Sequence, residues 1–263
     1  MAMTTRQRAR LSKTIQIVVF VAVILLLLFS LDWEKARYAF FSFEKLGPMF
    51  PDLIIIGLRN TLFYTVISFA FGLVLGLLLA LMKMASFAPY RWFATGFIEF
   101  FRGIPAILVL LAFGFGIPQA FGTSWPQPVN VMLALGLVSS AYIAETLRAG
   151  LQAVPKGQTE AARSLGMPAW RAMVTIVIPQ AFKIVLPPMT NEVILLTKDT
   201  SLAFILGASI AQYEMTKFGR DGITAIDAGL TPLVMAGLLY LIITIPLSLV
   251  ARKFESRSAR TKR

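Results

Sequence analysis

Long apolar runs without charges alternate with short polar segments along most of the chain. Several of these runs approach or exceed the roughly 20 residues that a helix needs to cross a bilayer. The pattern therefore predicts an all-α, polytopic membrane protein with about six transmembrane helices. They are expected at residues 14–31, 57–82, 93–116, 129–151, 187–213 and 232–251. We expect Pro105 to break the third helix, and Pro187 and Pro188 to open the fifth.

The polar segments suggest how the chain is divided. We expect residues 1–50 to hold an N-terminal tail, an additional transmembrane helix and an outer loop. Residues 51–252 would form one transmembrane domain, because no polar linker divides them, and residues 253–263 form a basic tail. The basic start followed by an apolar run is also typical of a secretory signal. No small-residue pair of the Ala-x-Ala type precedes Asp32, so a retained membrane helix is favoured.

Composition and charge support this class. Hydrophobic residues make up 57% of the chain and charged residues 14%, whereas soluble domains are about 25% charged. On a soluble protein the net charge of +12 would suggest nucleic acid. With the N-terminus inside, however, the inner segments hold 17 Lys and Arg residues and the outer segments five. This bias predicts cytoplasmic N- and C-termini and no nucleic acid partner.

Catalytic chemistry has little support in the sequence. The chain has no histidine and no cysteine, which excludes a Ser-His-Asp triad and any histidine or thiolate metal site. No phosphate-binding loop of the Gly-x-x-x-x-Gly-Lys-Ser/Thr type is present. No carboxylate cluster has the spacing of metal ligands. We therefore expect no catalytic residue, no metal and no cofactor on this chain.

Residues 157–179 form a charged island in the apolar sequence. We expect a short helix from Gln158 to Leu165, a left-handed stop at Gly166, and Pro168 in the first turn of a second helix. Helices this short are marginal alone in water, so they must pack against something. The chain's own membrane surface and another protein are both possible. A cytoplasmic location favours a cytosolic partner.

Ionisable residues inside predicted spans are costly and usually face a cavity or one another. Glu192, Lys198 and Asp199, with Asn191 beside them, either line a solute path or form a local ion-pair network. Glu99 and Arg102 lie three residues apart on one helix face and are typical of a surface pair. Because broken helices often line solute sites, the predicted break at Pro105 is a further candidate.

The island resembles the EAA loop of permease subunits of bacterial ATP-binding-cassette (ABC) importers. The family pattern is Glu-Ala-Ala, three residues, Gly, nine residues, and Ile-x-Leu-Pro. The chain has Glu160-Ala161-Ala162, Gly166, Ile176 and Ile178-Pro179, so isoleucine replaces the leucine. A narrower resemblance, to the polar amino acid subfamily (histidine, arginine, glutamine, glutamate or opines), covers residues 57–251. It rests on Asn60-Thr61-Leu62, Glu99 with Arg102-Gly103-x-Pro105, Tyr142-x-Ala144-Glu145 with Arg148, Gly157-Gln158, Pro179-Gln180-Ala181 and Lys198-x-Thr200-Ser201-Leu202.

The resemblance implies a five-helix type I importer core, one added N-terminal helix, and two short cytosolic coupling helices within residues 152–180. It implies an ATP-driven importer of a polar amino acid in the bacterial cytoplasmic membrane, surrounded by lipid. The implied partners are a cytosolic ATPase dimer that binds ATP and Mg, a second permease subunit, identical or similar, and an extracytoplasmic binding protein.

The residues carried over fall into two groups. Those implied to couple to the ATPase are Gly157, Gln158, Glu160, Ala161, Ala162, Gly166 and Pro179. Candidates for the substrate pathway are Asn60, Glu99, Arg102, Glu145, Asn191, Glu192, Lys198, Thr200 and Ser201. One alternative is a secondary amino acid transporter driven by an ion gradient, with Glu192 and Asp199 as ion sites. Another is an integral-membrane enzyme, for which no reactive constellation is visible.

Overall fold

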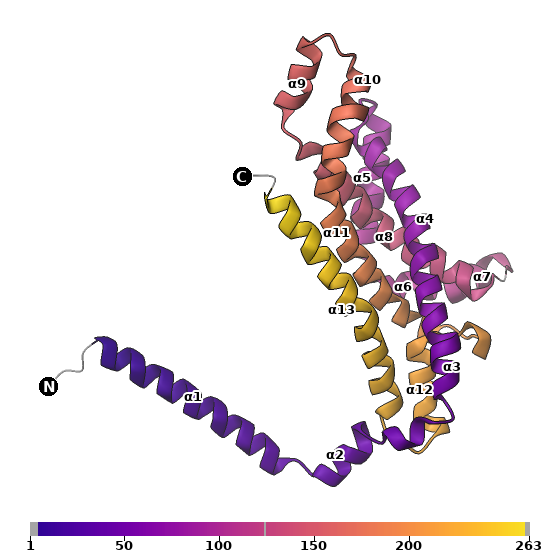
Figure 1. Cartoon of the computed structure of the whole chain (residues 1–263). Coiled ribbons are helices and arrows are strands. Elements are labelled where there is room, and N and C mark those ends of the chain that lie inside the picture. Colours follow the sequence, from indigo (N-terminus) through magenta and orange to yellow (C-terminus); the bar gives the residue numbers. More distant parts are fainter. Residues whose placement is uncertain (1–4, 124, 261–263) are drawn as a thin grey trace.

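The computed structural model describes residues 5–123 and 125–260, and no strand occurs among them. Figure 1 shows a bundle of long helices with one helix standing apart from it. The α-helices are α1 (Thr5–Ser30), α2 (Trp33–Phe40), α3 (Phe50–Asp52), α4 (Arg59–Met84), α5 (Ala88–Gly103), α6 (Ala106–Leu111), α7 (Ile117–Phe121), α8 (Gln127–Gln152), α9 (Lys156–Ser164), α10 (Ala169–Ala172), α11 (Ile178–Asp199), α12 (Met215–Ala225) and α13 (Thr231–Arg260). Shorter 3₁₀ or π turns are η1 (Phe43–Leu46), η2 (Leu53–Leu58), η3 (Ala112–Gly116), η4 (Met173–Val177), η5 (Thr200–Ile205) and η6 (Ile210–Gln212).

The prediction of an all-helical polytopic membrane protein is confirmed. Five helical stretches are long and apolar enough to span a membrane: residues 11–30, 50–84, 127–152, 169–205 and 231–256. A sixth is the pair α5 and α6–α7, which is bent by 101° at residues 104–105. The predicted break at Pro105 is therefore present, although this span begins earlier than expected, at Ala88. Pro105 lacks a backbone N–H and disfavours helical geometry in the preceding residue, so the chain turns there.

The expected start of the fifth helix is wrong. Pro187 and Pro188 lie inside α11, and the helical stretch runs from Ala169 to Ile205. Each proline removes one backbone hydrogen bond, but packing holds the helix together across the gap. Val185 and Pro187 are buried, and Val185 fits against Gly150 of α8. The helix also ends before the predicted Tyr213, because residues 206–213 form a loop that contains η6.

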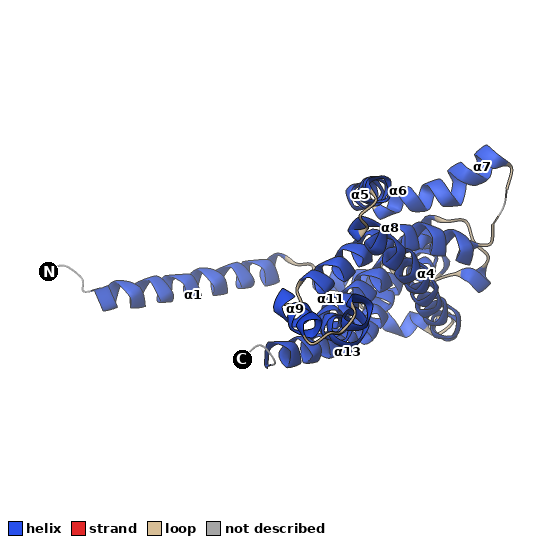
Figure 2. Cartoon of the chain, turned by 90° about the horizontal axis from the view of Figure 1, so that it is seen from above, coloured by secondary structure: helices blue, strands red, loops and turns tan. Residues whose placement is uncertain are grey.

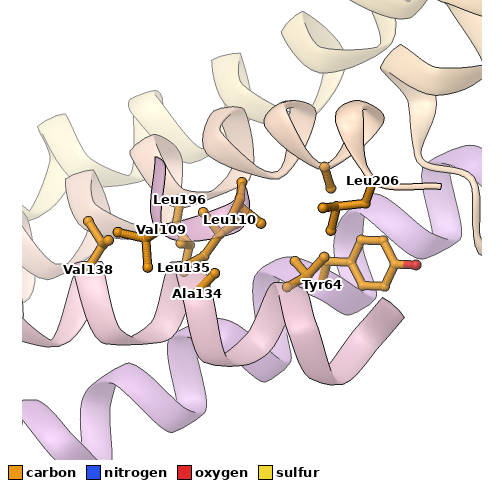
Figure 3. Close-up of a cluster of buried hydrophobic side chains, with 10 residues drawn as sticks. Tyr64, Val109, Leu110, Ala134, Leu135, Val138, Leu196 and Leu206 are labelled. Atoms are coloured by element: carbon orange, nitrogen blue, oxygen red, sulfur yellow. The ribbon is translucent and has the colours of Figure 1, made fainter. Parts of the chain in front are cut away.

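The centre of the bundle is the close packing of α4 against α8. Gly76 has no side chain at the point of contact, and a Cβ atom there would lie 2.9 Å from the backbone oxygen of Ser140. Small residues at such positions let membrane helices approach closely. The adjacent core joins Tyr64 of α4, residues of α6 and α8, and Leu196 and Leu206 (Figure 3).

The bundle has two distinct ends, which we call the loop end and the far end. The loop end carries α9 and α10, and the far end carries α3, η1 and α12 (Figure 1). At the far end, the segment with α2 and η1 is attached to the turn between α12 and α13. Tyr38 and Lys45 both bind the Asp227 carboxylate, and the Leu230 N–H donates to the Ala39 carbonyl over 2.7 Å.

The first helix, α1, has a different environment from the others. None of its residues 11–30 is buried in the chain, and both views show the helix pointing away from the bundle (Figures 1 and 2). Residues 17–29 of this helix are apolar on all sides, as expected of a helix surrounded by lipid or by another protein. It therefore contributes no packing to the core.

Candidate functional site

The loop end contains the predicted pair of short helices. Helix α9 ends at Ser164, and Gly166 adopts a left-handed conformation with φ of 82°. The Met167 N–H donates to the Ala162 carbonyl and the Gly166 N–H to the Arg163 carbonyl, at 3.1 and 3.0 Å. These two bonds form a Schellman motif, which ends a helix with glycine in the left-handed position. The predicted stop at Gly166 is present, and Pro168 lies one residue before α10.

This loop exposes a mixed apolar and charged surface. Leu165 is 88% exposed and Trp170 is 69% exposed, although both are large apolar residues. Of the seven predicted coupling residues only Ala162 is buried, while the other six lie on the surface: Gly157, Gln158, Glu160, Ala161, Gly166 and Pro179. Large exposed apolar residues grouped with charges are typical of a protein contact surface. The arrangement offers an exposed face to a partner and keeps Ala162 turned inward.

A second feature is a cavity of about 470 Å³ beside α11, which we call the solute cavity. It lies where the break between α5 and α6 faces α8 and α11. Its polar and charged lining residues are Arg102, Ser139, Tyr142, Glu192 and Asp199. The remaining walls come from Gly103, Ile104, Pro105, Ala106, Leu135, Val138, Leu195 and Leu196. This size and this mixture of apolar walls with a few polar groups suit a small solute.

The charges in the solute cavity are not neutralised by one another. Among the described residues, Glu192 and Asp199 form no ion pair, and neither does Arg102. The Arg102 guanidinium instead lies over the ring of Tyr142, 5.6 Å from its centre. Glu192 and Asp199 are seven residues apart on α11, which is about two turns, so both carboxyl groups face the same side. The cavity can therefore receive cationic groups at α11 and an anionic group at Arg102.

Several other predicted pathway residues do not line the solute cavity. Asn60 donates from its amide nitrogen to the carbonyls of Ala211 and Tyr213, at 2.8 and 2.9 Å, and so attaches the segment after η5 to α4. Thr200 is buried and donates to the carbonyl of Thr197. Glu99 and Asn191 are exposed outside the solute cavity.

Glu145 lies in an ion-pair cluster near the loop end. Its carboxylate accepts from Lys83 of α4, and Arg148 reaches its second oxygen over 2.7 Å. Arg148 also binds the side chain of Gln152. This cluster ties α4 to α8 and leaves Glu145 no free oxygen for a solute.

Two of the cavity residues were not singled out as pathway residues from the sequence. Tyr142 and Ser139 are uncharged, so they carry none of the cost that makes an ionisable residue conspicuous in a span. A signal was present in their spacing, since residues three apart share a helix face, but it does not distinguish a cavity from a helix contact. Lys198 of α11 and Ser201 of η5, by contrast, were predicted and lie outside the solute cavity, where they line a second cavity.

Comparison with known proteins places these features in a family. A family model described as binding-protein-dependent transport system inner membrane component matches residues 72–260. The Arginine transport system permease protein ArtQ of Bacillus subtilis (strain 168) is 37% identical over 216 residues, which cover 82% of this chain and 96% of that protein. The Glutamate/aspartate import permease protein GltK of Escherichia coli O157:H7 is 34% identical over 227 residues, covering 83% and 99%.

Solved structures agree with this assignment. The crystal structure of an amino acid ABC transporter with histidines matches with a TM-score of 0.71 and 35% identity, covering 79% of this chain and 94% of that one. A bacterial alginate ABC transporter shares the fold alone, with a TM-score of 0.60 and 14% identity, and covers 95% of this chain.

These matches cover most of the chain and include the loop at residues 157–179. They set aside the alternative of an ion-gradient-driven transporter, because a transport system of this kind works with a separate ATPase, which binds the ATP, and with a binding protein. They also place the chain in the inner (cytoplasmic) membrane as a multi-pass protein. The chain belongs to the family of binding-protein-dependent transport system inner membrane components, as a permease subunit of the amino acid ABC importer type.

Proposed function

We propose that this permease carries a polar amino acid through the solute cavity and that a positively charged side chain is favoured. The observation that supports this preference is the charge of the cavity, where two unpaired carboxyl groups face one guanidinium group. An amino acid zwitterion supplies one anion for Arg102 and one cation for α11. The second carboxyl group is then available for a further cation on the solute.

The relatives are compatible with a polar solute without deciding between its members. Those with high similarity are named for arginine, for glutamine, and for glutamate and aspartate. Of these, arginine alone carries the second positive charge that the pair Glu192 and Asp199 would neutralise. Burying a charge without a partner is costly, so a neutral side chain would leave one carboxylate unsatisfied.

The loop end is the proposed attachment point of the ATPase. Leu165 and Trp170 would be covered by the ATPase, and Glu160 would meet a basic group on it. Inward closure of two ATPase subunits would then move α9 and α10, and through η4 the helix α11 that lines the cavity. The two states must differ in their affinity for solute and nucleotide for transport to follow.

Orientation and assembly complete the proposal. The loop end, the N-terminus and the C-terminus would face the cytoplasm, as the distribution of 17 inner and five outer basic residues predicts. A second permease subunit, identical or similar, would complete the translocation pathway. A binding protein would deliver the amino acid to the far end.

The solute assignment is tested with the assembled transporter in vesicles, using radiolabelled arginine and glutamine. We expect Glu192→Gln combined with Asp199→Asn to raise the KM for arginine by about tenfold or more, since each lost charged hydrogen bond costs about 1.5–3 kcal/mol. The KM for glutamine should change less. Glu99→Gln removes an exposed carboxylate outside the cavity and serves as the matched control. Equal changes for both solutes, or none for arginine, would contradict the assignment.

A further inference from the structure

The loop at residues 157–179 is joined to the bundle by two helices, α8 before it and α11 at its end. Helix α8 ends at Gln152 and α9 begins at Lys156, so only residues 153–155 separate them. Helix α11 follows α10 and η4 within one helical stretch (Figure 1). A movement of the loop can therefore pass into α8, into α11 or into both, unless one of these helices is held in place.

Helix α8 is packed tightly against α4. Glycines on both helices make the contact close, namely Gly72 and Gly76 of α4 and Gly136 of α8. A Cβ atom at Gly72 would lie 2.3 Å from the Ser139 hydroxyl oxygen, and one at Gly136 would lie 3.1 Å from the backbone oxygen of Ser68. Because a contact packed this closely has little freedom to slide or deform, we expect α4 and α8 to move as one body.

An ion pair joins the end of α8 nearest the loop to α4. The Lys83 ammonium, at the end of α4, donates to one oxygen of the Glu145 carboxylate, and Arg148 donates to the other oxygen at 2.7 and 3.1 Å. The side chains of Lys83 and Glu145 are each 20% exposed. Arg148 lies on α8 itself, about one turn after Glu145. Lys83 is therefore the partner through which this cluster connects two helices.

Helix α11 is held less firmly than α8. Among the described residues, no ion pair joins α11 to another helix. Pro187 and Pro188 each remove one backbone hydrogen bond from it, and the solute cavity leaves open space along one side. Its start packs with the loop, because Val177 of η4 and Ala181 of α11 form one apolar cluster with Val154. A movement of the loop therefore carries the start of α11 with it.

We infer that Glu145 is a positioning residue of the transport cycle. Through its ion pair with Lys83 it fixes the end of α8 to α4, so that a movement of the loop displaces α11 relative to a stationary wall of the solute cavity. Ser139 and Tyr142 line the cavity from that wall. Glu145 touches no solute in this role and acts through the position of α8. The inference rests on the proposed coupling of the loop to the ATPase, and it adds which of the two helices is fixed.

The test compares two substitutions that act on the same carboxylate. Lys83→Met removes the connection to α4 and leaves Arg148 to neutralise Glu145, whereas Arg148→Met removes the partner within α8 and is the matched control. The assembled transporter in vesicles, supplied with its binding protein and with radiolabelled arginine and glutamine, is measured for uptake and for ATP hydrolysis. The readout is the number of solute molecules carried per ATP hydrolysed. A loss of folded protein does not change this ratio, because it lowers both rates together.

We expect Lys83→Met to lower this ratio by about tenfold while ATP hydrolysis continues, because removing one partner of a largely buried ion pair strongly weakens the contact it makes. Lys83→Arg keeps the charge and should retain most of the ratio. Arg148→Met should lower it by less than about twofold, since an ion pair within one helix contributes little. An unchanged ratio in Lys83→Met, or an equal fall in Arg148→Met, would overturn the positioning role.

A second variant replaces both partners, so that neither is left as an unpaired charge. Lys83→Cys with Glu145→Cys introduces the only two thiols on the chain, and Arg148 keeps Gln152 as a partner. A bifunctional methanethiosulfonate reagent then links the two thiols. We expect the unlinked variant to have a low ratio and the linked one to recover it, because the contact stays closed throughout the cycle. Linking that has no effect, or that stops uptake while ATP hydrolysis continues, would contradict a stationary α8.

The unmodified transporter, measured in the same vesicles, tests the proposed function separately. Absence of ATP-dependent uptake there would count against the proposed function itself. Uptake by the unmodified transporter, together with an unchanged ratio in Lys83→Met, would overturn only the role of Glu145.

Discussion

Glu214 is a buried carboxyl group that connects two helices at the far end. It caps the N-terminus of α12 and, through Tyr240, joins that helix to α13. The residue is fully buried, and this burial raises the pKa of Glu214 to about 7, although its hydrogen bonds act in the opposite direction. The folded chain thus holds a proton there more readily than the unfolded chain, where the pKa is 4.5.

This difference predicts a pH-dependent stability. Between the two pKa values the folded state binds more protons than the unfolded state, so the contribution of Glu214 is fully present below pH 4.5 and is lost as pH rises through about 7. The total change is of the order of 3 kcal/mol. The measurement is the thermal unfolding midpoint of the purified chain in detergent. As the pH is raised from about 5 to about 8, the midpoint of the unmodified protein should fall relative to that of the Glu214→Gln variant at the same pH. A constant or growing difference would contradict this.

Single residues also show where sequence reasoning reaches its limit. Glu192, Asp199 and Arg102 stand out because charge at membrane depth is expensive, and the structure brings them to one cavity. The same reasoning could not predict that Asn60 donates a hydrogen bond to the Ala211 carbonyl or that Lys83 forms an ion pair with Glu145. These partners lie 151 and 62 residues away in sequence, and only the tertiary fold brings them together.

Among the elements, the loop at residues 157–179 was the easiest to predict from the sequence and α11 the hardest. The loop depends on local chemistry, namely a helix stop that only glycine adopts without cost, and this can be read at Gly166. The course of α11 depends on its neighbours, because packing against α8 keeps it helical through Pro187 and Pro188. When only the local sequence is considered, proline is typical of a helix start, so the pattern wrongly predicted that this helix begins at Pro187.

The loop carries its own prediction. Glu160→Lys reverses a charge on the exposed surface, and Gly166→Asp puts a side chain in the left-handed position and a negative charge beside the negative end of α9. We expect each change to lower ATP-dependent uptake by about tenfold or more while the chain still inserts in the membrane, since one lost contact of 1.4 kcal/mol changes an equilibrium tenfold.

Uptake and ATP hydrolysis by the assembled transporter in vesicles measure this effect. Glu34→Lys makes the same substitution at an exposed residue of α2, at the far end, and should leave uptake unchanged. Uptake at the unmodified rate in Glu160→Lys or Gly166→Asp would refute the coupling role of the loop.

For the whole molecule, the prediction concerns which end faces the cytoplasm. Ser164 lies in the exposed loop end and Thr224 is exposed at the far end. In intact cells, a membrane-impermeant maleimide should label Thr224→Cys and leave Ser164→Cys unlabelled, whereas inside-out vesicles should give the reverse. Because the chain has no cysteine of its own, neither pattern has a background from this protein. Labelling of Ser164→Cys in intact cells would invert the proposed orientation.

The attachment of α1 at a single point has a consequence for how such a chain can be rebuilt. None of residues 11–30 is buried against the bundle, and the connection to the bundle runs through α2 and η1 to Asp227 and Leu230. A different apolar helix put in place of α1 would therefore not have to pack against the core. Replacing or removing this leading helix would leave the packing of the remaining helices unchanged.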